Sequence, residues 1–62
     1  MSQVKGSGKT EQDAVNDALI KAKAYCKSRG KTSGITEEDR SVHQVSNNPE
    51  PHYECDLWFT CD

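Results

Sequence analysis

The chain has 62 residues, with ten acidic and eight basic side chains and a formal net charge of −2. That balance disfavours a dedicated nucleic-acid or membrane-surface binder, which is normally clearly basic, and no apolar run approaches the roughly 18 residues of a membrane span. Leu, Ile, Val and Phe number only nine. A single domain over residues 1–62 would therefore have a thin core, and we expect self-association to supply the missing stability.

Residues 2–7 predict a short first strand. The overlapping segment Gly6-Ser7-Gly8-Lys9-Thr10 is similar to the end of a phosphate-binding loop, but that motif needs a glycine where this chain has Gln3. We interpret the segment as a flexible strand-to-helix turn. Adventitious anion binding by Lys9 and Thr10 at the start of a helix stays an alternative.

A helix is predicted over residues 11–29. Thr10 is a suitable N-cap, and Gly30 suits the position that follows the C-terminal cap. At 100° per residue, seven side chains fall within an arc of about 140° and form a core-facing stripe. They are Ala14, Val15, Ala18, Leu19, Ala22, Tyr25 and Cys26. Ile20 lies outside this stripe, which makes it a candidate contact residue.

The middle of the chain has weaker signals. Residues 31–38 are interpreted as a loop, and residues 39–46 as a strand. Val42 and Val45 are three positions apart, which breaks strict alternation and indicates a bulge. Residues 46–51, rich in Asn and Pro, predict a turn that joins this strand to the last one as a hairpin.

The last ten residues alternate strictly. One face carries Tyr53, Cys55, Leu57, Phe59 and Cys61, and we expect it to pack on the helix. The other face carries Glu54 and Trp58, both candidate contact residues, on a strand that we expect at the sheet edge or facing a partner. The predicted fold is α+β, in the order β-α-β-β, with one helix packed across a three-stranded antiparallel sheet.

Three cysteines are an odd number, which favours a reducing compartment and free, mostly buried thiols. Cys55 and Cys61 cannot pair with each other, since six residues of one strand span roughly 20 Å. A disulfide from Cys26 to either of them is the remaining alternative. We expect a cytoplasmic protein, or a periplasmic one if a leader was removed.

Three kinds of site are disfavoured. A metal site would have to combine Cys26, His43, His52, Cys55 and Cys61, whose spacing matches no metal-binding motif. A catalytic thiol would need partial exposure and a nearby base, whereas Cys55 and Cys61 lie on the core face. The basic residues near the helix end are explained by solvation, although weak phosphate contact is an alternative. They are Lys21, Lys23, Lys27, Arg29 and Lys31.

The helix entry, with Gly6-Ser7-Gly8, Thr10 to Val15, Ala18, Leu19 and Ala22, resembles that of dodecins. The ending His52 to Leu57 with Phe59 is similar to their last strand. The resemblance implies the β-α-β-β order and a tendency to associate. Small biofilm-modulating stress-response proteins resemble the same topology. The flavin-stacking tryptophan of dodecins has no counterpart within residues 35–40, and Glu54 replaces their glutamine, so no cofactor is carried over.

We therefore expect a small non-catalytic interaction or scaffold module that self-associates or docks on another protein. The alternatives are a small-ligand, flavin-like binding assembly and a weak nucleic-acid binder that uses the basic helix end.

Overall fold

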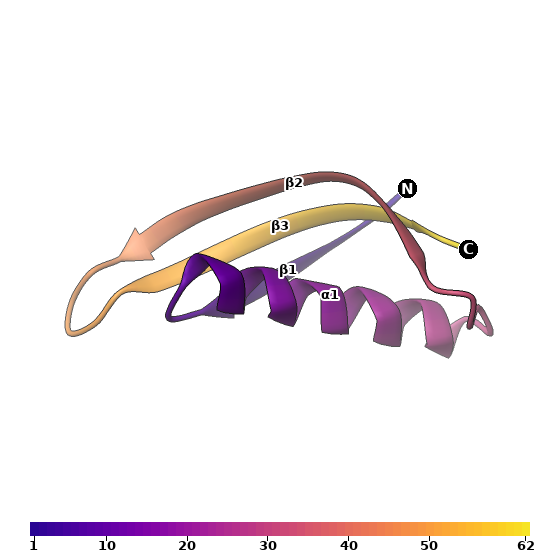
Figure 1. Cartoon of the computed structure of the whole chain (residues 1–62), viewed down its shortest axis with the longest axis horizontal. Helices are drawn as coiled ribbons and strands as arrows, with labels where there is room; N and C mark the ends of the chain where they lie inside the picture. Colours follow the sequence, from indigo (N-terminus) through magenta and orange to yellow (C-terminus); the bar gives the residue numbers. More distant parts are fainter.

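The structure is a computed structural model that describes all 62 residues. It contains the strand β1 (Ser2–Gly8), the helix α1 (Glu11–Ser28), and the strands β2 (Ile35–Ser46) and β3 (His52–Cys61). α1 lies across one face of a three-stranded antiparallel sheet (Figure 1). The predicted α+β fold and its β-α-β-β order are confirmed. The single helix does not combine the length and the apolar character needed to cross a membrane.

The strand order in the sheet is β1-β3-β2, so β3 is the central strand. The expectation that β3 lies at an edge is wrong. β3 pairs with β1 on one side and with β2 on the other, so both rows of its backbone hydrogen-bonding groups face neighbouring strands. The free edges of the sheet belong to β1 and β2.

The ends of α1 follow from its capping residues. The Thr10 hydroxyl accepts a hydrogen bond from the Asp13 backbone N–H at 3.0 Å. At the other end, Gly30 has a φ of 79°, and the Gly30 and Lys31 N–H groups donate to the Lys27 and Cys26 carbonyls. These two bonds form a Schellman motif, which needs the positive φ that glycine adopts freely. The predicted helix is confirmed to within one residue.

The core is a cluster of eight buried residues between α1 and β3, all of which belong to the two predicted apolar faces. The eight residues are Ala14, Val15, Ala18, Ala22, Cys26, Cys55, Leu57 and Phe59. The Phe59 ring meets the edge of the Tyr25 ring, with centroids 5.8 Å apart and planes at 84°. Because five of these eight residues are alanine or cysteine, little apolar surface is buried for each residue that is ordered.

Gly6 explains how so small a core packs closely. A Cβ atom at this position would lie 2.3 Å from both the Ala14 carbonyl oxygen and the Ala18 nitrogen, so any side chain would separate β1 from α1. Gly6 is buried within β1 and pairs with Cys55. Its role is close approach of strand and helix, which corrects the interpretation of this segment as a flexible turn.

β2 starts at Ile35, four residues earlier than predicted, so part of the predicted loop is strand. The reason is its position. α1 covers β1 and β3, and no residue of β2 is fully buried, so β2 lacks the alternation by which a half-buried strand is recognised. Its pairing with β3 shifts between Glu37 and Asp39 and again between Gln44 and Ser46. The second shift confirms the bulge predicted near Val45.

Candidate contact surfaces

The sheet face opposite α1 carries no covering element (Figure 1). This surface, called the open face below, consists of Glu54, Asp56, Trp58 and Thr60 of β3 with their cross-strand neighbours in β1 and β2. Trp58 lies at its centre, because its direct neighbours are Gln3 in β1 and Asp39 in β2. The Trp58 side chain is partly buried, whereas the flanking Leu57 and Phe59 are fully buried on the other side. The predicted outward direction of Trp58 is confirmed.

The open face is strongly acidic. It carries five carboxylates and a single lysine, and the carboxylates are Glu38, Asp39, Glu54, Asp56 and Asp62. Only Glu54 has a basic side chain within 4.0 Å, with Lys5 Nζ at 3.5 Å and His43 Nε2 at 3.9 Å.

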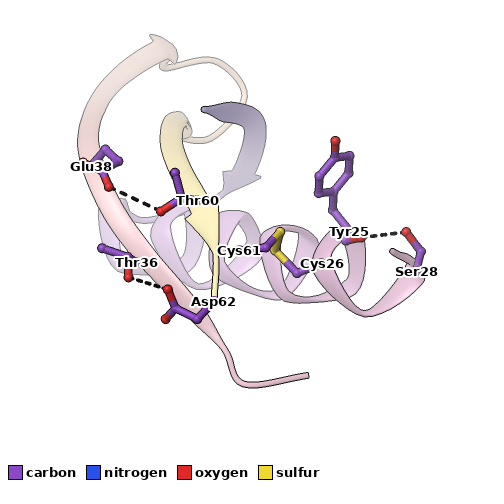
Figure 2. The surroundings of a disulfide bond; sticks show 8 residues. All are labelled: Tyr25, Cys26, Ser28, Thr36, Glu38, Thr60, Cys61 and Asp62. Atoms are coloured by element: carbon purple, nitrogen blue, oxygen red, sulfur yellow. Dashed lines mark hydrogen bonds between the residues drawn. A yellow bond between two sulfur atoms is a disulfide. The ribbon is translucent and has the colours of Figure 1, made fainter. Parts of the chain in front are cut away.

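Two hydrogen bonds hold further acidic groups in place on this face. Thr60 donates to Glu38 at 3.4 Å, and Thr36 donates to Asp62 at 2.8 Å (Figure 2). Both carboxylates keep their charge uncompensated by any cation. A large aromatic side chain therefore shares this face with four carboxylates that have no cationic partner within 4.0 Å.

The solvent side of α1 carries unpaired lysines toward its C-terminal end. We call the solvent side of α1, formed by Ile20, Lys23, Ala24 and Lys27, the outer helix face. Ile20 is 67% exposed and is the largest exposed apolar side chain of the helix. Lys23 and Lys27 follow it at i+3 and i+7, and neither has a carboxylate within 4.0 Å. By contrast, Lys21 is paired with Asp17 at 3.0 Å, as the i, i+4 spacing predicts.

A cleft of about 380 Å³ lies beside this basic surface. It is lined by Lys23, Cys26, Lys27, Lys31, Thr32 and Gly34. Lys31 also lacks a carboxylate partner. Three lysines that sequence reasoning attributed to simple solvation thus line one cavity, beside which their charges are available to an anion.

The two candidate anion contacts at the helix N-terminus are occupied by other groups of the chain. The Thr10 hydroxyl caps α1 through Asp13. Lys9 Nζ lies 3.4 Å from Glu50, in the turn between β2 and β3.

A hydrogen bond near the helix N-terminus joins β1 to α1, because Asp17 accepts from the Ser7 N–H at 2.9 Å. This bond and the Lys21 ammonium hold the pKa of the Asp17 carboxyl below its ordinary range. The N-terminal segment thus acts in fixing β1 to α1.

The cysteines do not follow the expectation of three free thiols. Cys26 and Cys61 form a disulfide (Figure 2), with Cα atoms 5.5 Å apart. Cys55 is the free cysteine and is fully buried, and burial raises the pKa of its thiol. Two of the cysteines therefore form a covalent crosslink, and the third is a buried free thiol. No cluster of three or more His, Cys, Asp or Glu side chains suited to a metal ion occurs in the chain.

Sequence reasoning singled out Trp58, Ile20 and Glu54, and the structure places them on two surfaces. Trp58 and Glu54 share the open face, whereas Ile20 lies on the outer helix face. Asp39 was missed, because its position beside Trp58 depends on the register shift in β2. Lys23 and Lys27 could have been grouped with Ile20 from their i+3 and i+7 spacing.

Comparisons of the chain with family models, with curated proteins and with solved structures find no match. The resemblance to dodecins therefore stays a prediction.

Proposed function

We propose that the chain is a small non-catalytic interaction module that self-associates, with the open face as its contact surface and Trp58 at the centre. The observation that carries this proposal is a partly buried tryptophan on a bare sheet face. Tryptophan is the residue type most enriched among those that dominate binding energy at interfaces. Such residues act best when surrounding polar groups exclude water, and the neighbouring carboxylates and threonines supply a polar surround.

The open face is a stronger reason to expect self-association than the small size of the core is. A disulfide that closes a loop of 35 residues stabilises a domain by about 3–4 kcal/mol in the loop-entropy description. A crosslink of this kind is one of the ways in which small domains compensate for a small core. The folded monomer thus has a source of stability other than a partner, and the partly buried Trp58 on an uncovered face is the stronger argument for self-association.

The disulfide also supports an oxidising compartment. Structural disulfides persist outside the cytosol and are rare within it. Of the two expected locations, the periplasmic or otherwise oxidising one fits the Cys26–Cys61 bond better than the cytoplasm does.

A second candidate function is supported by the cleft beside α1. Lys23, Lys27 and Lys31 line it without carboxylate partners, and lysine is a common point-charge ligand of phosphate. Weak binding of a phosphate-bearing polymer is the corresponding activity. Fluorescence anisotropy with labelled single-stranded DNA tests it, and Lys27→Gln should weaken binding whereas Lys9→Gln should not.

Sedimentation velocity at micromolar concentration tests the principal proposal. The wild-type protein should have a mass above that of the monomer. Trp58→Glu should weaken association about 30-fold or more, the effect of losing a dominant interface residue. Val45→Glu is the matched control, because Val45 is 44% exposed and apolar but lies away from Trp58. A monomeric wild-type protein, or equal effects of the two substitutions, would contradict the proposal.

A further inference from the structure

We infer that the open face of one copy receives the outer helix face of a second copy, so that subunits stack head to tail. The inference rests on the proposed function and adds the identity of the occupant. Three observations support it. Each surface has an apolar centre, the unpaired charged side chains beside the two centres are of opposite sign, and two open faces would repel each other.

Each of the two surfaces has an apolar centre. Trp58 is the aromatic centre of the open face, and Ile20 with Ala24, one turn later, is the apolar centre of the outer helix face. Docking them would give β3 a helix on each of its two faces. A sheet with helices on both faces is a common layered arrangement, and here the second helix would come from the neighbouring copy.

The charges on the C-terminal side of Ile20 are opposite to those beside Trp58, whereas Asp17 on its N-terminal side is paired with Lys21. Lys23 and Lys27 lie within about 60° of Ile20 around the helix axis, and both lack a carboxylate partner. Asp39 and Asp56 flank Trp58 across the sheet and along the strand, and both lack a cationic side-chain partner. Unpaired lysines would thus meet unpaired aspartates when Ile20 approaches Trp58.

Symmetric pairing of two open faces is disfavoured by the same charges. It would oppose five carboxylates to five others, with only Lys5 of each copy to compensate. Like charges brought together across an interface oppose association. The open face therefore fits a cationic surface, and the outer helix face of this chain is one.

A head-to-tail contact leaves one surface of each kind free at the ends of every assembly. Such an interface produces closed rings if the rotation between copies closes, and growing stacks if it does not. We therefore expect wild-type protein to form species larger than a dimer as concentration rises.

A complementation experiment tests the geometry. Ile20→Glu removes the outer helix face and leaves the open face intact, whereas Trp58→Glu does the reverse. Each variant alone should associate about tenfold or more weakly than wild type, because burial of a large apolar side chain is lost. An equimolar mixture should form a heterodimer and nothing larger, because each variant supplies one intact surface.

Circular dichroism and thermal melting of both variants establish that they are folded, as the exposure of Ile20 leads us to expect. Lys27→Gln should weaken wild-type association about two- to fivefold, as expected for an exposed ion pair. Lys9→Gln, which removes a lysine paired with Glu50, should leave it unchanged. Raising the salt concentration to about 1 M should weaken association in the wild type, since charge interactions are then screened within about 3 Å.

The outcomes separate the inference from the proposed function. If wild-type protein associates, Trp58→Glu prevents it and Ile20→Glu does not, the head-to-tail geometry is wrong and the open face remains the contact surface. If both variants fail alone and their mixture stays monomeric, the contact is not head to tail. A wild-type protein that is monomeric at all accessible concentrations overturns both proposals.

Discussion

Cys26 in the last two turns of α1 is bonded to Cys61 at the end of β3, which ties the C-terminal part of the helix to the central strand of the sheet. Figure 2 shows the bond spanning the two layers beside Tyr25. The crosslink lies near the end of the molecule where both termini emerge (Figure 1). The disulfide therefore holds together the C-terminal ends of α1 and β3, which are followed by a loop and by the end of the chain.

Removing the crosslink should reduce stability strongly. The double variant Cys26→Ala, Cys61→Ala should lose about 3–4 kcal/mol of unfolding free energy, because its unfolded chain regains the freedom of a 35-residue loop. Urea denaturation followed by tryptophan fluorescence measures the loss. The wild-type protein treated with a thiol reductant provides the control and should show a similar midpoint to the variant. Equal midpoints with and without reductant would contradict a structural role for the bond.

The free thiol of Cys55 should react slowly in the folded protein. Its side chain is fully buried, and burial raises the pKa of the thiol, so little thiolate is present near neutral pH. A maleimide reagent followed by mass spectrometry should add one label per chain in denaturant and almost none under native conditions. Rapid native labelling, or three labels in denaturant without reductant, would show that the cysteines are arranged differently.

Gly6→Ala should destabilise the fold by about 1–3 kcal/mol or more. The added methyl group would lie 2.3 Å from backbone atoms of α1, which have no rotamer with which to move away, and overpacking has this typical cost. Thermal melting of Gly6→Ala against Ser7→Ala measures the effect. Ser7 is exposed on the same strand, so its variant should melt within a few degrees of wild type. Equal melting temperatures would mean that β1 and α1 are farther apart than described.

Stability should fall on acidification partly through Asp17. Its pKa is lowered in the folded protein, first by the Ser7 N–H and then by Lys21, from an ordinary value of 3.8. A lowered folded-state pKa contributes stability above the unfolded value and loses it as pH falls through the folded value. The loss attributable to Asp17 should therefore occur below about pH 4.

Asp17→Asn is the matched variant, because asparagine keeps an acceptor for the Ser7 N–H and removes the charge. Urea midpoints measured from about pH 6 to about pH 2 should fall more steeply for wild type than for Asp17→Asn. Parallel curves for the two proteins would contradict the assignment of this pH dependence to Asp17.

Local features of the sequence determined the helix and the inner face of the sheet. The ends of α1 depend on the chemistry of Thr10 and Gly30 within a few residues. The stripe from Ala14 to Cys26 and the alternation in β3 follow from the 3.6- and two-residue periods of helix and strand, which need no knowledge of the rest of the chain. The α+β fold could be predicted for the same reason.

The tertiary structure decided the strand order, the extent of β2 and the cysteine pairing. Strand order depends on which edges meet, and no residue pattern along β3 distinguishes a central strand from an edge strand whose outer face is exposed. The first residues of β2 form a strand because they pair with the end of β3, although neither face of β2 is buried. Cys26 bonds to Cys61 rather than Cys55 because both Cys26 and Cys61 lie at the end of the domain where α1 ends. Cys55 instead lies opposite Gly6, which packs on the first half of α1. These are distances between segments far apart in the chain, and they exist only after the helix and the sheet have packed.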